Sequence, residues 1–293
     1  MNKSIFLIFV LSTIFALNMK GQLVEKTYTL TGFSKLELSS FDDVMVREGD
    51  MESVIVKYHE AYAKYIQVGQ DGKCFKMRIK KNTINEQGVQ ICITIHKLRD
   101  FVVEGCKKVI FTNLNLRDFK LNISKCNDVC LNNLSFNKID LKLETSDKAL
   151  LKNFRINQGV AKFSSIPDFK MDINAQKFEA RLNSIDKCIV KGSVKDFRFK
   201  TKASENVNLN LKFETAVVDC NKSNEFDFMS NSSGSLDITF NSITNVNLNC
   251  DLKNLILTTK SCGNVYLLGH SKKFKFNNKS SGNVKMDGFV IGK

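Results

Sequence analysis

Two adjacent stretches of sequence decide the fold of this chain: VIFTNLNLRDFKLNISKCND at residues 109–128 and VCLNNLSFNKIDLKLETSDK at residues 129–148. Laid one above the other, they place apolar residues at matching positions, and the same phase returns every 19 or 20 residues almost to the C-terminus. A period of this length is typical of solenoids, in which each repeat forms one coil. One apolar residue per coil, here called the anchor, marks the phase: Val109, Val129, Ala149, Phe169, Cys188, Val207, Phe226, Val246, Val265 and Val284.

Each coil carries two short runs in which apolar and polar residues alternate, such as Ile139-x-Leu141-x-Leu143 and, from the anchor onward, Val129-x-Leu131. Alternation with period two indicates a strand with one buried face, and no segment after residue 98 keeps helical spacing. Because one coil cannot bury its own apolar face, the coils must stack. We therefore predict an all-β fold, a right-handed parallel β-helix or β-solenoid of about ten coils, which at a spacing of about 4.8 Å is about 50 Å long.

The residue before each anchor supports stacking in register. Over five coils its charge alternates, and in the later coils it is mostly asparagine. Opposite charges on neighbouring strands attract, and stacked amides form ladders of hydrogen bonds. An interpretation of Asp128 and Asp168 as a catalytic acid and base is weak, because the coil that carries Lys148 lies between them. The residues are Lys108, Asp128, Lys148, Asp168 and Lys187, then Asn206, Glu225, Asn245, Asn264 and Asn283.

Residues 22–97 lack the repeat, although they alternate at Leu36-x-Leu38 and suggest a short helix around residues 60–66. We predict that they form an N-terminal β-rich cap and that residues 98–293 form the solenoid. A cap is expected because the open end of a stack of strands is a template for aggregation. At the other end, the tail Gly288–Gly292 either folds under the final coil or docks on another chain.

Residues 1–21 resemble a secretory signal peptide, with Lys3 before a largely apolar stretch from Ile5 to Leu17. We expect export to the periplasm, the cell surface or the medium, and no transmembrane anchor after cleavage; a retained anchor is the alternative. Loss of Lys3 and Lys20 with the leader lowers the formal charge from +14 to +12. The excess is mostly lysine, which indicates a diffuse positive field rather than a bidentate recognition site.

Nine cysteines in an exported chain permit disulfides and leave at least one thiol unpaired. Cys106 and Cys126 occupy the same repeat position one coil apart, so stacking should make them neighbours. Two interpretations stay open. They form a disulfide, or they are small buried residues that fill a tight corner.

The chain resembles the family of putative auto-transporter adhesin head domains known as GIN domains, found in exported Bacteroidetes-type proteins. The resemblance rests on the opening segment Gly32–Leu38, on Val44–Gly49, and on the small-residue turns Ser261–Val265 and Ser280–Val284. In most coils the sequence departs from the glycine-rich turns of that family, as at Lys107. The resemblance implies an exported β-solenoid with an adhesin-like role.

We find no catalytic, cofactor or metal motif. The three histidines stand apart from any nucleophile, and there is no phosphate-binding loop, Cys-x-x-Cys pair or calcium-binding nonapeptide repeat. A β-helix polysaccharide lyase or hydrolase would need a cleft walled by insertions, whereas the coil length varies by only one residue. Nucleic-acid binding is disfavoured because the basic residues form no motif interleaved with aromatic residues.

One surface feature suggests a contact site. The residue after the anchor should point outward, and in four of the first five coils it is apolar: Ile110, Cys130, Leu150 and Ile189. Such a stripe marks a contact with a partner or a second copy, unless the cap or a loop covers it. We therefore expect a non-enzymatic, adhesin-like binding module of the cell envelope that binds a surface glycan or an envelope protein. The alternatives are an envelope scaffold that binds another protein and, less favoured, a polysaccharide-cleaving enzyme.

Overall fold

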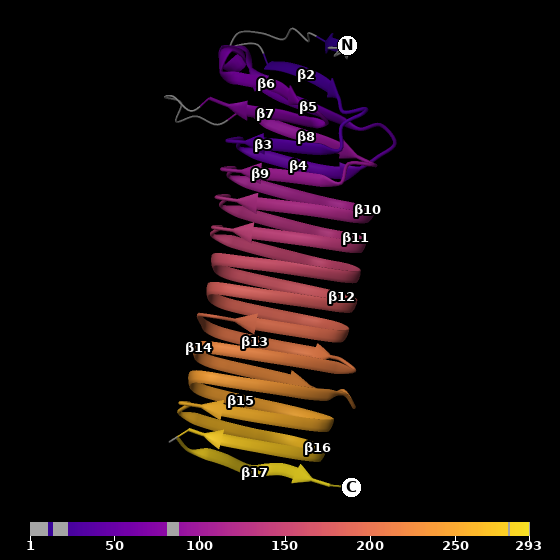
Figure 1. Ribbon diagram of the computed structural model, residues 1–293. Helices are drawn as coiled ribbons and strands as arrows, with labels where there is room; N and C mark the ends of the chain where they lie inside the picture. The colour runs from indigo at the N-terminus through magenta and orange to yellow at the C-terminus, as the bar shows by residue number, and fades with distance from the viewer. Residues whose placement is uncertain (1–10, 14–22, 81–87, 281, 293) are drawn as a thin grey trace.

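The computed structural model describes residues 11–13, 23–80, 88–280 and 282–292. The strands stack into one rod, with the N-terminal strands at one end and β17 at the other (Figure 1). The predicted β-solenoid is therefore confirmed. Its coils are built by β10 (Lys108–Ser124), β11 (Asp128–Glu144), β12 (Lys148–Thr201), β13 (Ser204–Lys212), β14 (Thr215–Ser230), β15 (Ser235–Lys260), β16 (Asn264–Lys279) and β17 (Val284–Ile291).

Neighbouring coils stack in parallel, and the anchors lie directly above one another. Val109 pairs with Val129, and Val129 pairs with Ala149. The alternating charges lie in the same register, because Lys108 pairs with Asp128. In the C-terminal coils the asparagine ladder is present, where the side-chain Nδ2 of Asn264 donates to Oδ1 of Asn245 at 3.0 Å.

A third inward-facing run, which the sequence analysis did not identify, lies between the two that it did. In β10 this run is Leu114 and Leu116, which pair with Leu134 and Phe136 in β11. All four side chains are buried. Each coil is therefore lined on three sides, because two corners turn the chain between the runs.

A left-handed backbone occurs at the corner after the first run and at the corner that leads into the next coil. Asn133 has φ 55° and Thr145 has φ 54°. Positive φ recurs at the position of Thr145 in most other coils, and at the position of Asn133 in four of them, at Asn113, Asn153, Gly192 and Gly269. Asparagine tolerates this conformation better than other non-glycine residues. At the first corner the asparagines also form a ladder, in which Asn133 donates to Asn113 at 3.1 Å and accepts from Asn153 at 2.7 Å.

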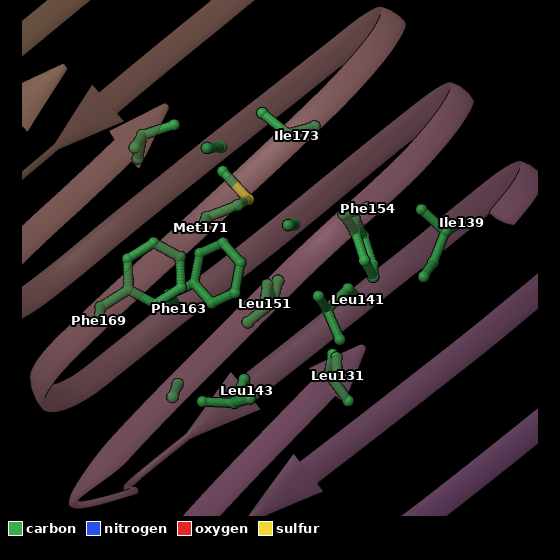
Figure 2. Close-up of a cluster of buried hydrophobic side chains, with 14 of the residues drawn as sticks. Leu131, Ile139, Leu141, Leu143, Leu151, Phe154, Phe163, Phe169, Met171 and Ile173 are labelled. Atoms are coloured by element: carbon green, nitrogen blue, oxygen red, sulfur yellow. The ribbon is translucent and has the colours of Figure 1, made fainter. Parts of the chain in front are cut away.

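The core runs along the axis of the rod and is filled by aliphatic and phenylalanine side chains (Figure 2). Phe163 and Phe169 lie beside each other with ring centroids 4.3 Å apart, and both are buried. Full burial of one such side chain contributes about 2–3 kcal/mol. Stability therefore comes from stacking coils, since the core residues of each coil contact those above and below.

The N-terminal region extends the stack and then closes it. Strand β4 pairs in parallel with β10, and β3 pairs in parallel with β9, so both continue the coil pattern. Beyond them, β5 pairs antiparallel with both β2 and β8, which ends the parallel stack. The elements are β2 (Leu23–Thr29), β3 (Lys35–Ser39), β4 (Asp43–Glu48), β5 (Ser53–His59), the 3₁₀ helix η1 (Glu60–Tyr65), β6 (Ile66–Asp71), β7 (Cys74–Ile79), β8 (Gln90–Ile95) and β9 (Asp100–Glu104).

One carboxylate joins this cap to the first coil. Asp42 accepts hydrogen bonds from the backbone N–H groups of Gly88 at 2.9 Å and Val89 at 3.3 Å, and its other oxygen lies 2.8 Å from Nζ of Lys107. Partial burial raises the pKa of Asp42, but these hydrogen bonds outweigh it and hold the pKa below the ordinary value.

The two ends of the chain concern the expected leader and the expected position of the C-terminal tail. Most of the expected leader lies outside the described residues; Leu11–Thr13 forms a short strand, β1, that pairs antiparallel with β2. The tail does not fold under the final coil. It continues the stack as β17, parallel to β16, and the Phe289 ring packs on Phe274 at 5.1 Å. Among the described residues, no helix is long and apolar enough to cross a membrane.

Candidate functional site

A hollow with a volume of about 860 Å³ lies on the outer surface beside the cap. It is lined by four neighbouring strands, in the order β6, β7, β3 and β9, which hold their outward side chains in register. The regular coils beyond β10 contribute nothing to its wall. Its lining residues are Glu37, Leu38, Ser39, Ile66, Gln67, Val68, Gly69, Lys76, Met77, Arg78, Val102 and Glu104.

Glu37 sits at the centre of one row of polar side chains in the hollow. Its carboxylate lies 2.7 Å from Nζ of Lys35 and 3.6 Å from Nζ of Lys76. The hydrogen bond from Lys35 holds the pKa of Glu37 below its ordinary value, with Lys76 adding to the effect. Glu37 is therefore ionised at neutral pH, and it accepts hydrogen bonds rather than donating a proton.

Arg78 anchors the second row. Its Nε donates to Oε1 of Gln67 at 2.7 Å, which fixes the plane of the guanidinium group. Ser39 pairs with Arg78 across the strands, and Glu104 pairs with Ser39. Glu104 is in turn held by Lys125, whose Nζ lies 2.6 Å away.

The lining mixes polar and apolar groups and its charges balance, because Glu37 and Glu104 offset Lys76 and Arg78. Carboxylate, guanidinium, amide and hydroxyl groups on fixed strands offer many hydrogen bonds. Val102 supplies an apolar surface between them. This combination suits an uncharged ligand rich in hydroxyl groups and attracts a highly charged one only weakly.

None of these lining residues was predicted from the sequence to belong to a site. The alternation in Lys35-Leu36-Glu37-Leu38 does place Glu37 on an outer face. However, β7 is added to β3 from a distance of more than 30 residues in the chain, and no local pattern encodes that pairing.

The predicted stripe occupies the outer face of the sheet formed by the anchor strands. Ile110, Cys130 and Leu150 lie side by side, because each pairs with the next. Ile189 follows two coils later in β12, beyond Lys170, and all four predicted residues are half-buried. We refer to these four residues, with the two added next, as the stripe.

The structure extends the stripe into the cap. Met45 pairs with Ile110, and Cys92 pairs with Met45. Met45 is 44% exposed. The described strands of the cap therefore do not cover the stripe; they continue the sheet and lengthen the apolar surface.

Cys106 and Cys126 are buried neighbours, as stacking predicts, and both are free thiols in the structure. The backbone N–H of Cys106 lies 3.5 Å from Sγ of Cys126. A hydrogen bond between the two side chains, together with burial, raises the pKa of the Cys106 thiol. A disulfide between them stays a prediction. No cluster of three or more His, Cys, Asp or Glu side chains suited to a metal occurs in the described part of the chain.

Residues 32–240 match the family described as "Putative auto-transporter adhesin, head GIN domain". The chain belongs to this family. The matched part of the GIN domain includes every residue that lines the hollow and the whole stripe.

Three similar crystal structures come from Parabacteroides species. A putative adhesin from Parabacteroides distasonis is 13% identical, with 92% of this chain and 98% of that chain covered and a TM-score of 0.48. A putative adhesin from Parabacteroides merdae is 12% identical, with 90% and 97% covered and a TM-score of 0.42. A putative lipid binding protein from Parabacteroides distasonis is 13% identical, with 92% and 97% covered and a TM-score of 0.42. No curated protein matches the sequence.

Proposed function

We propose that this GIN domain is a non-enzymatic, adhesin-like binding module of the cell envelope that binds a surface glycan in the hollow. The observation that carries the proposal is the lining itself, in which Lys76 pairs with Glu37 and Arg78 with Gln67 while many hydrogen-bonding groups remain on a rigid sheet. A glycan offers hydroxyl groups to such groups and C–H faces to Val102. The family's adhesin description agrees with a binding role.

Catalysis is the less favoured alternative. A polysaccharide hydrolase needs a carboxylic acid that is protonated near neutral pH, so its pKa must be raised. Glu37 shows the opposite, because Lys35 and Lys76 hold its pKa down. The solenoid coils also add no wall to the hollow.

The second candidate is a scaffold that binds another envelope protein. The stripe favours this alternative, since an apolar surface on an exported protein marks a contact. Both readings place the protein outside the cytoplasm, as the leader-like residues 1–21 suggest.

The proposal is tested by applying the purified protein to a glycan array from low to high salt while monitoring saccharide cleavage. Binding to one glycan class that survives high salt supports the hollow, because a near-neutral lining depends little on screened charge. Binding that disappears with salt would assign it to the general positive charge and contradict the proposal. Cleavage of the glycan would replace it with an enzyme.

A further inference from the structure

The face that carries the stripe also carries a column of alternating charges. Asp43 in β4 pairs with Lys108, which pairs with Asp128, which pairs with Lys148. The next two coils of β12 continue the alternation with Asp168 and Lys187 at the same repeat position. Six successive strands therefore read negative, positive, negative, positive, negative, positive beside a column that is apolar except at Lys170.

We propose that this face binds the same face of a second copy, with the two solenoids antiparallel. The twofold axis lies in the interface, parallel to the strands, between the strands of Cys130 and Leu150. This arrangement reverses the order of the six strands in the partner. A strand that carries an aspartate in the charged column therefore faces a strand that carries a lysine. Asp128 then faces the partner's Lys148, Lys108 faces the partner's Asp168, and Asp43 faces the partner's Lys187.

Every contact in the charged column is attractive in that arrangement. If the twofold axis ran along the rod instead, each residue of the charged column would face a residue of the partner. That residue would lie four positions further along the equivalent strand. Lys148 would then meet Lys152 of the partner subunit, and Asp168 would meet Asp172 of the partner subunit. Like charges facing each other oppose association, so the charge pattern favours antiparallel copies.

In the neighbouring column, Cys130 faces the partner's Leu150 next to the axis. Ile110 faces the methylene chain of the partner's Lys170, whose Nζ lies 3.3 Å from the carboxylate of Asp168 on the same strand. At the ends of the interface, the partner's Ile189 faces Met45. There the surface has a depression of about 120 Å³ lined by Met45, Cys92 and Ile110, which can receive that isoleucine.

The size of the face predicts a weak dimer. Six strands at about 4.8 Å and two outward steps of about 7 Å give a face of about 29 Å by 14 Å, or about 400 Å² per copy. Two copies therefore bury about 800 Å², which is below the roughly 1,200 Å² of a stable specific interface and agrees only with a weak, transient dimer. This inference does not depend on what the hollow binds.

The test uses charge reversal and mixing. Sedimentation velocity at low salt, from about 1 to 200 μM protein, should show a monomer–dimer equilibrium, as expected for a weak interface. Asp128→Lys alone and Lys148→Asp alone should each weaken dimerisation by about tenfold or more, because each sets like charges opposite one another twice. An equimolar mixture of the two variants should dimerise nearly as well as the unsubstituted protein, since each variant then faces its complement.

Recovery on mixing distinguishes the interface from folding, because a misfolded chain is not repaired by a second variant. Asp140→Lys is the matched control. Asp140 pairs with Lys120 on a different face of the rod, in the same alternating manner, and its reversal should leave dimerisation unchanged. The proposal is overturned if the protein stays monomeric over the whole range, if Asp128→Lys does not weaken the dimer, or if mixing does not restore it.

Discussion

Replacement of Asn133 by alanine and by glycine separates the two roles of the corner asparagines. Asn133 has φ 55° and exchanges one hydrogen bond with each neighbouring coil. Two exposed hydrogen bonds contribute about 0.5 kcal/mol each, so either substitution loses about 1 kcal/mol from the ladder. Alanine adds about 1 kcal/mol for the left-handed backbone, which glycine adopts freely.

We therefore expect Asn133→Ala to lower the free energy of unfolding by about 2 kcal/mol, and Asn133→Gly by about 1 kcal/mol. For a chain of this size each kcal/mol shifts Tm by about 2–4 °C, so thermal unfolding followed by circular dichroism resolves the two variants.

Asn137 is the matched control. Asn137 accepts a hydrogen bond from Asn157 of the next coil at 3.0 Å, at a different corner from Asn133. Its φ is not positive. At this position alanine should be better tolerated than glycine, which loses more conformational entropy on folding. The order of the two substitutions must therefore reverse between positions 133 and 137. The same order at both positions would refute the claim that the corner conformation limits stability.

Three further predictions concern the core, the cap and the thiols. Phe163→Ala should lower the free energy of unfolding by about 3–5 kcal/mol, measured by urea denaturation, because it opens a cavity in a buried ring pair; a loss below about 1 kcal/mol would contradict the packing. Asp42→Asn should destabilise the protein at pH 7 and progressively less as the pH falls below 3.8. The depressed pKa of Asp42 gives stability that is present above its ordinary value of 3.8 and lost as the pH falls through the folded value. Equal destabilisation above and below these values would contradict this account. In the native protein, thiol reagents should label Cys92 and Cys130 first because the other seven cysteines are buried; fast labelling of Cys188, which is fully buried with a raised pKa, would contradict it.

The repeat was readable from the sequence because burial in a solenoid depends on position within the coil. The anchors, the alternating charges and the half-exposed stripe all follow from a period of 19 or 20 residues and a strand period of two. The third inward run was missed because it is short. In β11 it consists of Leu134 and Phe136, and the corner at Asn133 shifts the alternation just before it.

The cap and the hollow were less readable because they depend on pairing between distant segments. Strand β4 joins the solenoid by pairing with β10, more than 60 residues later, and this register brings Met45 beside Ile110. The same kind of pairing sets Arg78 beside Ser39. Local alternation shows which face of each strand points outward, but not which strands become neighbours.

The central claim is that the hollow binds a glycan, and calorimetric titration of two arginine variants tests it most directly. Arg78 lines the hollow, whereas Arg181 is an exposed arginine on β12 that pairs with Glu179 away from it. For the best glycan found on the array, Arg78→Ala should raise Kd by about tenfold or more, as expected for the loss of a charged hydrogen-bonding group, and Arg181→Ala should leave Kd unchanged. Equal affinity for both variants would place the glycan elsewhere and contradict the proposed site.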